Sequence, residues 1–281
     1  MNYAQVTTES ELMAHLAAGS CCVAAGMTDL YPSGIMQSQA LPVVDITSVP
    51  TLHGIRAEPH GYWIGATTRW SDLLDHRWPA GMTLLAEAAA QVGAVQVQNA
   101  ATVAGNVCNA SPAADGVPVL MSLDAEVEIG SSSGVRRLPV SGFVSGVRQT
   151  VLGDSEYVRG FVVPQPDPGA SSAFLKLGSR AYLVISIAMV AGVLHCDDDG
   201  RVVGVKLSLG ACSPVAARLS SVEAALQGQT ATTALVDKVR AADVERAIRP
   251  IDDVRASAAY RSRAAVQLVR DTVALLVERL S

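Results

Sequence analysis

The order of apolar and polar positions predicts a small α/β unit at the start of the chain. A mixed apolar and polar stretch at 11–17 is typical of a short helix, and apolar runs at 22–25 and 42–46 are typical of strands. The first of these strands runs directly into Gly26, which marks a turn. We therefore expect the first fifty residues to form a compact helix-and-strand unit.

The middle of the chain is predicted to be rich in strands. The expected elements are a strand at 62–66, helices at 70–74 and 84–92, a hairpin of 125–129 with 136–140, and a strand at 157–163. Thr67 or Thr68 is placed to cap the first helix, and Gly93 to end the second. Pro164, Pro166 and Pro168 make regular structure hard to continue, so we expect a domain boundary beside them.

The last third of the chain predicts an antiparallel sheet covered by helices. Its expected elements are strands at 173–177, 186–194 and 201–209, then helices at 216–226 and 235–247 and a final one. In that final helix apolar residues recur at three-and-four spacing: Val266, Val269, Val273, Leu276, Val277 and Leu280. Asp197–Gly200 lacks the ligand spacing of a calcium loop and is read as a hairpin turn.

The composition changes the picture in one respect. Hydrophobic residues make up 49% and charged residues 17% of the 281 residues, whereas charged residues are about 25% of an average soluble domain. This leaves two alternatives open, an interior rich in Ala and Val or a surface that a partner covers. The net charge of −5 without a basic stripe argues against nucleic acid. We expect no membrane span, no signal segment and a cytoplasmic protein.

No metal site is expected in this chain. The five cysteines (Cys21, Cys22, Cys108, Cys196 and Cys212) have no C-x-x-C spacing, and the five histidines are dispersed. We expect buried free thiols rather than zinc or iron–sulfur ligands.

A first candidate for binding chemistry is the turn that follows the strand at 22–25. Its sequence, Ala25-Gly26-Met27-Thr28-Asp29-Leu30, can present backbone N–H groups to an anion. Without a Cβ, Gly26 would let phosphate oxygens approach the main chain, and Thr28 adds a hydroxyl donor. A turn of this kind taken alone is more often a simple connection.

A second candidate is the segment 99–115, which is dense in small and hydrogen-bonding residues. Thr102, Asn106, Ser111 and Asp115 offer donors and acceptors that could fix a ribityl chain, phosphates or a ribose. A polar loop without a ligand explains the segment equally well. The chain contains neither G-x-G-x-x-G nor a P-loop, so a Rossmann site is excluded as the explanation for its glycines.

Taken in order, these segments resemble the medium, FAD-binding subunit of the molybdenum hydroxylases, the xanthine dehydrogenase and carbon monoxide dehydrogenase family. Residues 25–30 are similar to the family's A-G-G-T-D-L loop, 102–106 to its T-I-G-G-N loop, and 110–115 to its A-S-P-x-x-D. The resemblance continues through 44–46, 52–55, 64–68, 118–125, 137–139, Phe143, 162–164, Phe174, Lys176, Arg180 and 260–261. It therefore covers nearly the whole chain.

The resemblance implies an α+β fold with a two-lobed FAD-binding domain of the vanillyl-alcohol-oxidase (PCMH) type. The implied division is an N-terminal lobe at 1–54, a central lobe at 55–168 and a C-terminal antiparallel-sheet-plus-helices domain at 169–281, with FAD between the lobes. The residues implied to bind FAD are Ala25, Gly26, Met27, Thr28, Asp29, Leu30, Thr102, Ala104, Gly105, Asn106, Ser111, Asp115 and Lys176.

Three positions depart from the family pattern. Met27 and Ala104 each replace a glycine beside the expected pyrophosphate, and a side chain there costs about 1 kcal/mol or more if the backbone needs φ > 0. Gln98 stands where the family often has Arg. Lys176, with Arg180 four residues on, is implied to pass near the flavin ring as a positive charge, and a solvated pair is the alternative.

The implied function is electron transfer. In the family a large molybdenum-cofactor subunit oxidises the substrate, two [2Fe-2S] clusters in a small subunit relay electrons, and the FAD subunit passes them to an external acceptor. The resemblance therefore implies a heterotrimer, and no catalytic residue is expected in this chain. The alternatives are a stand-alone FAD oxidoreductase of the vanillyl-alcohol-oxidase type and a non-enzymatic scaffold that has lost flavin binding.

Overall fold

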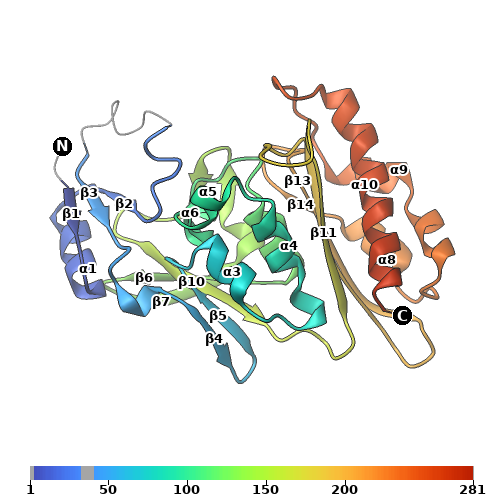
Figure 1. Ribbon diagram of the computed structural model, residues 1–281, viewed down its shortest axis with the longest axis horizontal. Coiled ribbons are helices and arrows are strands. Elements are labelled where there is room, and N and C mark those ends of the chain that lie inside the picture. The colour runs from blue at the N-terminus through green and yellow to red at the C-terminus, as the bar shows by residue number, and fades with distance from the viewer. Residues whose placement is uncertain (1–2, 33–40, 281) are drawn as a thin grey trace.

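The computed structural model describes residues 3–32 and 41–280, which lie in three parts along the long axis of the molecule (Figure 1). The first part holds β1 (Tyr3–Gln5), α1 (Glu9–Ala18), β2 (Cys22–Ala24) and β3 (Val43–Asp45). Both β1 and β2 pair with β3 in parallel. Thr8 caps α1 through a 3.2 Å hydrogen bond from the Glu11 N–H, and Leu12 and Leu16 of the helix are buried against this small sheet.

The central part is an antiparallel sheet with helices on one side (Figure 1). In spatial order its described strands are β4 (Ile55–Glu58), β5 (Gly61–Gly65), β10 (Tyr157–Pro164), β6 (Glu126–Ser131) and β7 (Gly134–Pro139). The helices are α3 (Trp70–Asp75), α4 (Leu84–Ala90), α5 (Val95–Gln98), α6 (Val103–Cys108) and α7 (Gly116–Ser122). A short pair, β8 (Val144–Gly146) and β9 (Gln149–Thr150), follows β7.

The C-terminal part is a second antiparallel sheet that is packed on both faces. Its described strands are β11 (Ser171–Leu177), β12 (Ala188–Cys196), β13 (Val202–Gly210) and β14 (Ala217–Arg218). The helices α8 (Ser220–Leu226) and α10 (Ala258–Glu278) lie on the outer face, while α4 and α7 contact the inner face. Two smaller elements, a 3-10 turn at 233–238 and α9 (Ala241–Ala247), complete this layer. The inner face therefore joins this sheet to the central core.

A half-buried charge network joins the first part to the central sheet. Glu9, in α1, accepts hydrogen bonds from Arg159 Nε at 2.7 Å and from the Tyr157 hydroxyl at 2.5 Å, both in β10. Arg159 also donates to Glu128 of β6 at 2.9 Å. Although burial opposes ionisation, the bonds from Arg159, Tyr157 and Thr51 lower the pKa of Glu9 to about 2.

The expected α+β architecture is confirmed, with local corrections. Neither Thr67 nor Thr68 caps α3, because their hydroxyls donate to the carbonyls of Leu52 and Gly54 at 3.0 Å. The second expected helix ends at Ala90, before Gly93. The expected helix at 216–226 begins with a strand, and the one at 235–247 is broken into a 3-10 turn and α9. The division of the chain after residues 54 and 168 stays a prediction.

Candidate cofactor-binding site

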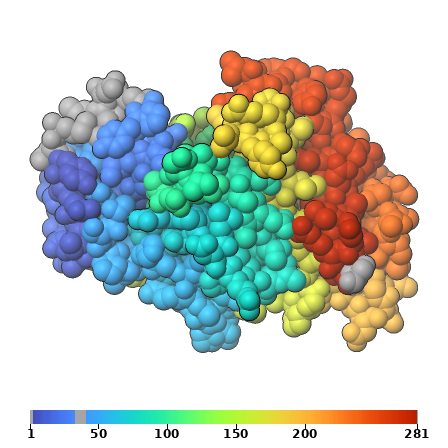
Figure 2. Space-filling model, in the orientation of Figure 1, coloured from blue at the N-terminus to red at the C-terminus, as the bar shows by residue number. Residues whose placement is uncertain are grey.

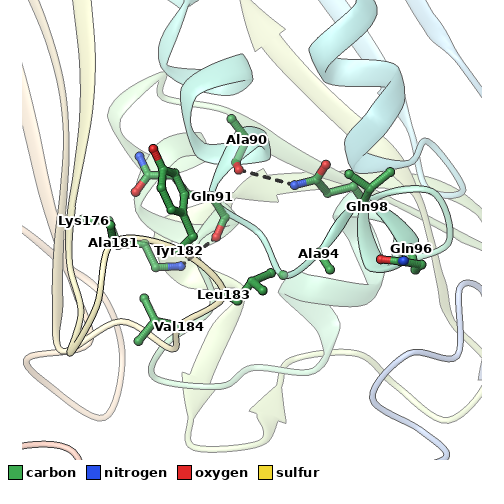
Figure 3. Close-up of a pocket in the computed structure, with 12 residues that line it drawn as sticks. Ala90, Gln91, Ala94, Gln96, Gln98, Lys176, Ala181, Tyr182, Leu183 and Val184 are labelled. Atoms are coloured by element: carbon green, nitrogen blue, oxygen red, sulfur yellow. Dashed lines mark hydrogen bonds between the residues drawn. The ribbon is translucent and has the colours of Figure 1, made fainter.

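A cavity of about 500 Å³ lies between the first part and the central helices. One wall is the segment 22–30 and the other includes Thr102, Gly105 and Asn106. Ile185 also lines a neighbouring hollow of about 280 Å³, which shares Lys176 and Leu183 with a third hollow of about 320 Å³ (Figure 3). The three hollows are adjacent, so together they suit an elongated ligand.

Gly26 brings the two walls together. A Cβ at this position would lie 2.7 Å from the Ala100 carbonyl carbon and 2.8 Å from Ala101 Cα. Both are backbone atoms, and these distances are too short for any side chain to be accommodated. The glycine is therefore needed for close approach of the second segment to the first. That Gly26 also lets phosphate oxygens approach the main chain stays a prediction, and Gly26 does line the cavity.

The first segment carries a row of available donors. Within the described residues, the backbone N–H groups of residues 25–29 form no hydrogen bond, although all five residues line the cavity. Thr28 is exposed, and Asp29 pairs with Arg148 at 2.8 Å. Consecutive free N–H groups at a turn bind anions, so this wall fits a phosphate-bearing group.

The second segment is a helix start rather than an irregular loop. The Thr102 hydroxyl caps α6 by accepting from the Gly105 N–H at 3.0 Å, and Asn106 Oδ1 accepts from the Gly116 N–H at 3.0 Å. Ala104 is buried in the first turn of α6, where its backbone is helical. The cost expected if the backbone at residue 104 needed a positive φ therefore does not arise, because Ala104 is helical.

Met27 differs, because its φ is 55° and the left-handed region disfavours a side chain. Three further non-glycine residues at or beside the cavity share this conformation: Ala110 with φ 47°, Arg148 with φ 58° and Leu183 with φ 53°. Strained backbone of this kind collects at binding sites, where the surrounding structure holds it. Strained backbone therefore lies in the cavity wall at Met27 and in the segments beside it.

Two predicted site residues form a buried ion pair. Lys176 Nζ lies 2.9 Å from Asp115 Oδ2, and the two side chains are 4% and 9% exposed. The Ser186 hydroxyl donates to Asp115 at 2.8 Å, and Lys176 also donates to the Gln91 carbonyl at 3.1 Å (Figure 3). Burial raises the pKa of Asp115, while Lys176 and Ser186 oppose that rise. The alternative of a solvated Lys176–Arg180 pair is wrong, because the Lys176 side chain is buried against Asp115, whereas Arg180 is exposed and donates to the Leu183 carbonyl.

Other wall residues supply further polar atoms. The Trp70 indole N–H is buried without a hydrogen-bond partner in the described chain. Burial raises the pKa of the Cys108 thiol to about 12, so this thiol stays protonated at neutral pH. The Ser111 hydroxyl accepts from the Ala113 N–H at 3.3 Å and thereby shapes the turn before α7. Gln98 is buried and donates to the Ala90 carbonyl (Figure 3).

Sequence reasoning missed three contributors to this site: Arg148, Ser186 and Ile185. Arg148 donates both to Asp29 and to the Asn109 carbonyl, so it ties the two walls together. Ile185 lines the cavity from the loop between β11 and β12, and Ser186 of the same loop donates to Asp115. None of the three stands in a recognisable spacing, because their positions depend on contacts between distant segments.

Two small-residue walls, N–H groups without a partner among the described residues, and a buried ion pair suit an extended, anionic ligand. Residues 1–166 match the family described as "FAD binding domain in molybdopterin dehydrogenase", and residues 173–275 match "CO dehydrogenase flavoprotein C-terminal domain". The chain therefore belongs to the FAD-binding subunits of the molybdenum hydroxylases, which are oxidoreductase subunits. The resemblance seen in the sequence is confirmed.

Relatives and solved structures agree with this assignment. The chain is 33% identical to the nicotinate dehydrogenase FAD-subunit of Eubacterium barkeri over 56% of this chain and 55% of that protein. It is 30% identical to the putative xanthine dehydrogenase FAD-binding subunit of Escherichia coli K12 over 78% of this chain and 75% of that protein. A carbon monoxide dehydrogenase structure from Hydrogenophaga pseudoflava matches with a TM-score of 0.92 and 29% identity, over 99% and 98% of the two chains.

No helix within residues 3–32 and 41–280 is long and apolar enough to span a membrane. In the same ranges, no three His, Cys, Asp or Glu side chains lie close enough together to hold a metal ion.

Proposed function

We propose that this chain holds FAD in the cavity between residues 22–30 and 101–109 and passes electrons from [2Fe-2S] clusters of a small partner subunit to an external acceptor. A large partner subunit with the molybdenum cofactor would oxidise the substrate, and the three chains would form a cytoplasmic heterotrimer. The row of free N–H groups at residues 25–29, facing a wall that Gly26 brings close, is the observation that carries this proposal.

Each predicted residue has a distinct part in the proposed site. The N–H groups of residues 25–29 would hold the pyrophosphate, with the exposed Gly105 leaving room beside α6. Thr102 and Asn106 shape this wall through their hydrogen bonds to Gly105 and Gly116. These two side chains therefore act through the backbone that they hold.

The buried pair of Lys176 and Asp115 would set the electrostatic environment at the far end of the site. Lys176 lines the two smaller hollows, where its remaining N–H would donate to a bound group while Asp115, 2.9 Å away, balances its charge. When bound, FAD supplies the two-electron and one-electron chemistry that protein side chains lack. The chain's part is to bind and orient the cofactor and to adjust its potential.

The test is purification of the tagged chain from its native host, followed by assays of flavin, molybdenum and iron. The proposal predicts flavin together with both metals and two accompanying chains. Flavin alone, with no accompanying chain, would favour a stand-alone FAD oxidoreductase. Absence of flavin would contradict both functions and favour a scaffold.

A further inference from the structure

The three tryptophans of the chain differ in what their indole N–H groups contact. Trp63 Nε1 donates to Glu128 at 3.3 Å, and Trp78 Nε1 donates to the Leu73 carbonyl at 2.9 Å. Trp70 Nε1 has no hydrogen-bond partner among the described residues, although the side chain is only 1% exposed. Buried indole N–H groups are usually paired, because an unpaired buried donor lowers stability. The N–H of Trp70 therefore calls for an acceptor that the described chain does not supply.

The backbone fixes Trp70 beside one wall of the cavity. Its N–H donates to the Ala101 carbonyl at 3.2 Å, and its neighbour Arg69 pairs with Thr102 in an antiparallel bridge. Figure 2 shows the cyan and green helices of the central part packed against the blue first part. The cavity lies between these two parts, and Trp70 lines it. The indole is thus held where a bound molecule can reach it.

Gly116 leaves room for the edge of the indole ring. A Cβ at Gly116 would lie 3.1 Å from Trp70 Cη2, 3.6 Å from Trp70 Cζ2 and 2.9 Å from Asn106 Oδ1. Since Cζ2 and Nε1 are both bonded to Cε2, the N–H belongs to the edge of the ring that lies near Asn106. Asn106 Oδ1 accepts from the Gly116 N–H, whereas its Nδ2 donates to no residue in the described ranges. This stretch of wall therefore offers two donors without a protein partner.

The chemistry of the cavity indicates what these donors bind. An indole N–H can only donate, so the matching ligand atom must be an acceptor. The facing wall also presents donors, the backbone N–H groups of residues 25–29. Among the described lining residues, Asp29 carries the one carboxylate, and it is paired with Arg148 at 2.8 Å. Donors on both walls suit a ligand segment that is rich in oxygen acceptors, such as phosphates and hydroxyl groups.

We propose that the Trp70 indole N–H donates a hydrogen bond to an oxygen of the phosphate and ribityl chain of FAD. This inference rests on the proposed function, because FAD supplies that oxygen. The unpaired donor destabilises the free chain, and the bound cofactor removes this cost. Trp70 thereby favours the FAD-bound state over the free state.

The first measurement is FAD affinity. Trp70→Phe removes the N–H but keeps an aromatic ring in the core. When the full chain is stripped of flavin and titrated with FAD by flavin fluorescence, this variant should bind FAD roughly five- to ten-fold more weakly than wild type. Trp78→Phe is the matched control, because it deletes the same atoms from a buried indole that does not line the cavity. It should bind FAD as tightly as wild type.

Urea unfolding of the same flavin-free chains distinguishes a ligand contact from a packing role. Both variants lose the same ring atoms, but only Trp78→Phe also loses a hydrogen bond, the one to the Leu73 carbonyl. Trp78→Phe should therefore lower the unfolding midpoint more than Trp70→Phe does. The order of the two variants in stability should thus be the reverse of their order in FAD affinity.

The outcomes separate this inference from the proposed function. Wild type that binds no FAD contradicts the proposed function itself. Wild type that binds FAD, with Trp70→Phe binding it equally tightly, overturns the hydrogen bond from Trp70 and leaves the proposed function standing. An equal loss of affinity in Trp78→Phe, or a larger loss of stability in Trp70→Phe than in Trp78→Phe, would also overturn it, because the effect would then come from packing.

Discussion

Replacing Met27 and Ala104 by glycine, separately, should have opposite effects on stability. Both positions depart from the glycines of the family pattern, but only Met27 has a left-handed backbone, with φ 55°. Relief of the left-handed strain, less the extra chain entropy of glycine in the unfolded state, should stabilise Met27→Gly by about 0.5–1 kcal/mol. The same replacement in a helix lacks this benefit.

For Ala104→Gly the structure predicts a loss. A glycine within α6 costs about 1 kcal/mol relative to Ala, and removal of a buried methyl group adds about 0.8 kcal/mol. Ala104 is 5% exposed, so most of both effects applies. The variant should therefore be destabilised by about 1.5–2 kcal/mol.

Urea unfolding of both variants, followed by circular dichroism, measures these changes. FAD must be absent throughout, because a ligand stabilises the folded state by RT ln(1 + [L]/Kd), so that any change in FAD affinity would add to the measured change in stability. Met27→Ala is the matched control, since it shortens the side chain but keeps a Cβ in the left-handed region. Stabilisation by Met27→Ala as large as by Met27→Gly, or stabilisation by Ala104→Gly, would show that left-handed strain is not what distinguishes the two positions.

Three further predictions concern ion pairs. The pKa of Glu9 is about 2 in the folded state and about 4.5 in the unfolded state, so its ionised form stabilises the fold above pH 4.5, and this stabilisation is lost as the pH falls toward 2. Glu9→Gln should therefore remove up to about 3 kcal/mol of the pH-dependent stability. A pH profile of urea unfolding that is the same in Glu9→Gln as in wild type would exclude this role of Glu9. Lys176→Met should cost about 3–5 kcal/mol by leaving Asp115 buried and unpaired, and the double variant with Asp115→Leu should recover part of it in thermal unfolding. Arg148→Ala should lower FAD affinity several-fold in a fluorescence titration, with under about 1 kcal/mol of destabilisation. Arg136→Ala is the control, because Arg136 forms an exposed ion pair outside the cavity wall. An equal loss of FAD affinity in Arg136→Ala would count against a role of Arg148 at the site.

Elements whose signal is local could be predicted from the sequence. The C-terminal strands and the last helix follow from their own alternation and spacing, and α10 buries Val266, Val269, Val273 and Leu276 as that spacing requires. The start of α6 was missed although Thr102 is a good N-cap residue. Gly105 and Asn106 are weak helix formers, so the segment reads as a loop until tertiary packing decides.

The site residues could be named from the resemblance, but their mutual arrangement could not. Residue 26 must be a glycine because the backbone of Ala100, 74 residues away in the chain, packs against it. No local sequence pattern predicts such a contact. Asp115 and Lys176 were each expected to face the cofactor, whereas their pairing with each other and with Ser186 depends on how β11 packs against the central helices. Arg148 carries no sequence signal at all.

FAD binding between the two walls is measured most directly by the amount of FAD released when the chain, purified from its native host, is denatured. Wild type should release about one FAD per chain, and so should Gly142→Ala, where an added Cβ meets nothing closer than 3.9 Å. Gly26→Ala should release little FAD while keeping the same far-ultraviolet circular dichroism, because its Cβ forces the two walls apart. Absence of FAD from wild type, or a full complement of FAD in Gly26→Ala, would mean that FAD is not held between these walls.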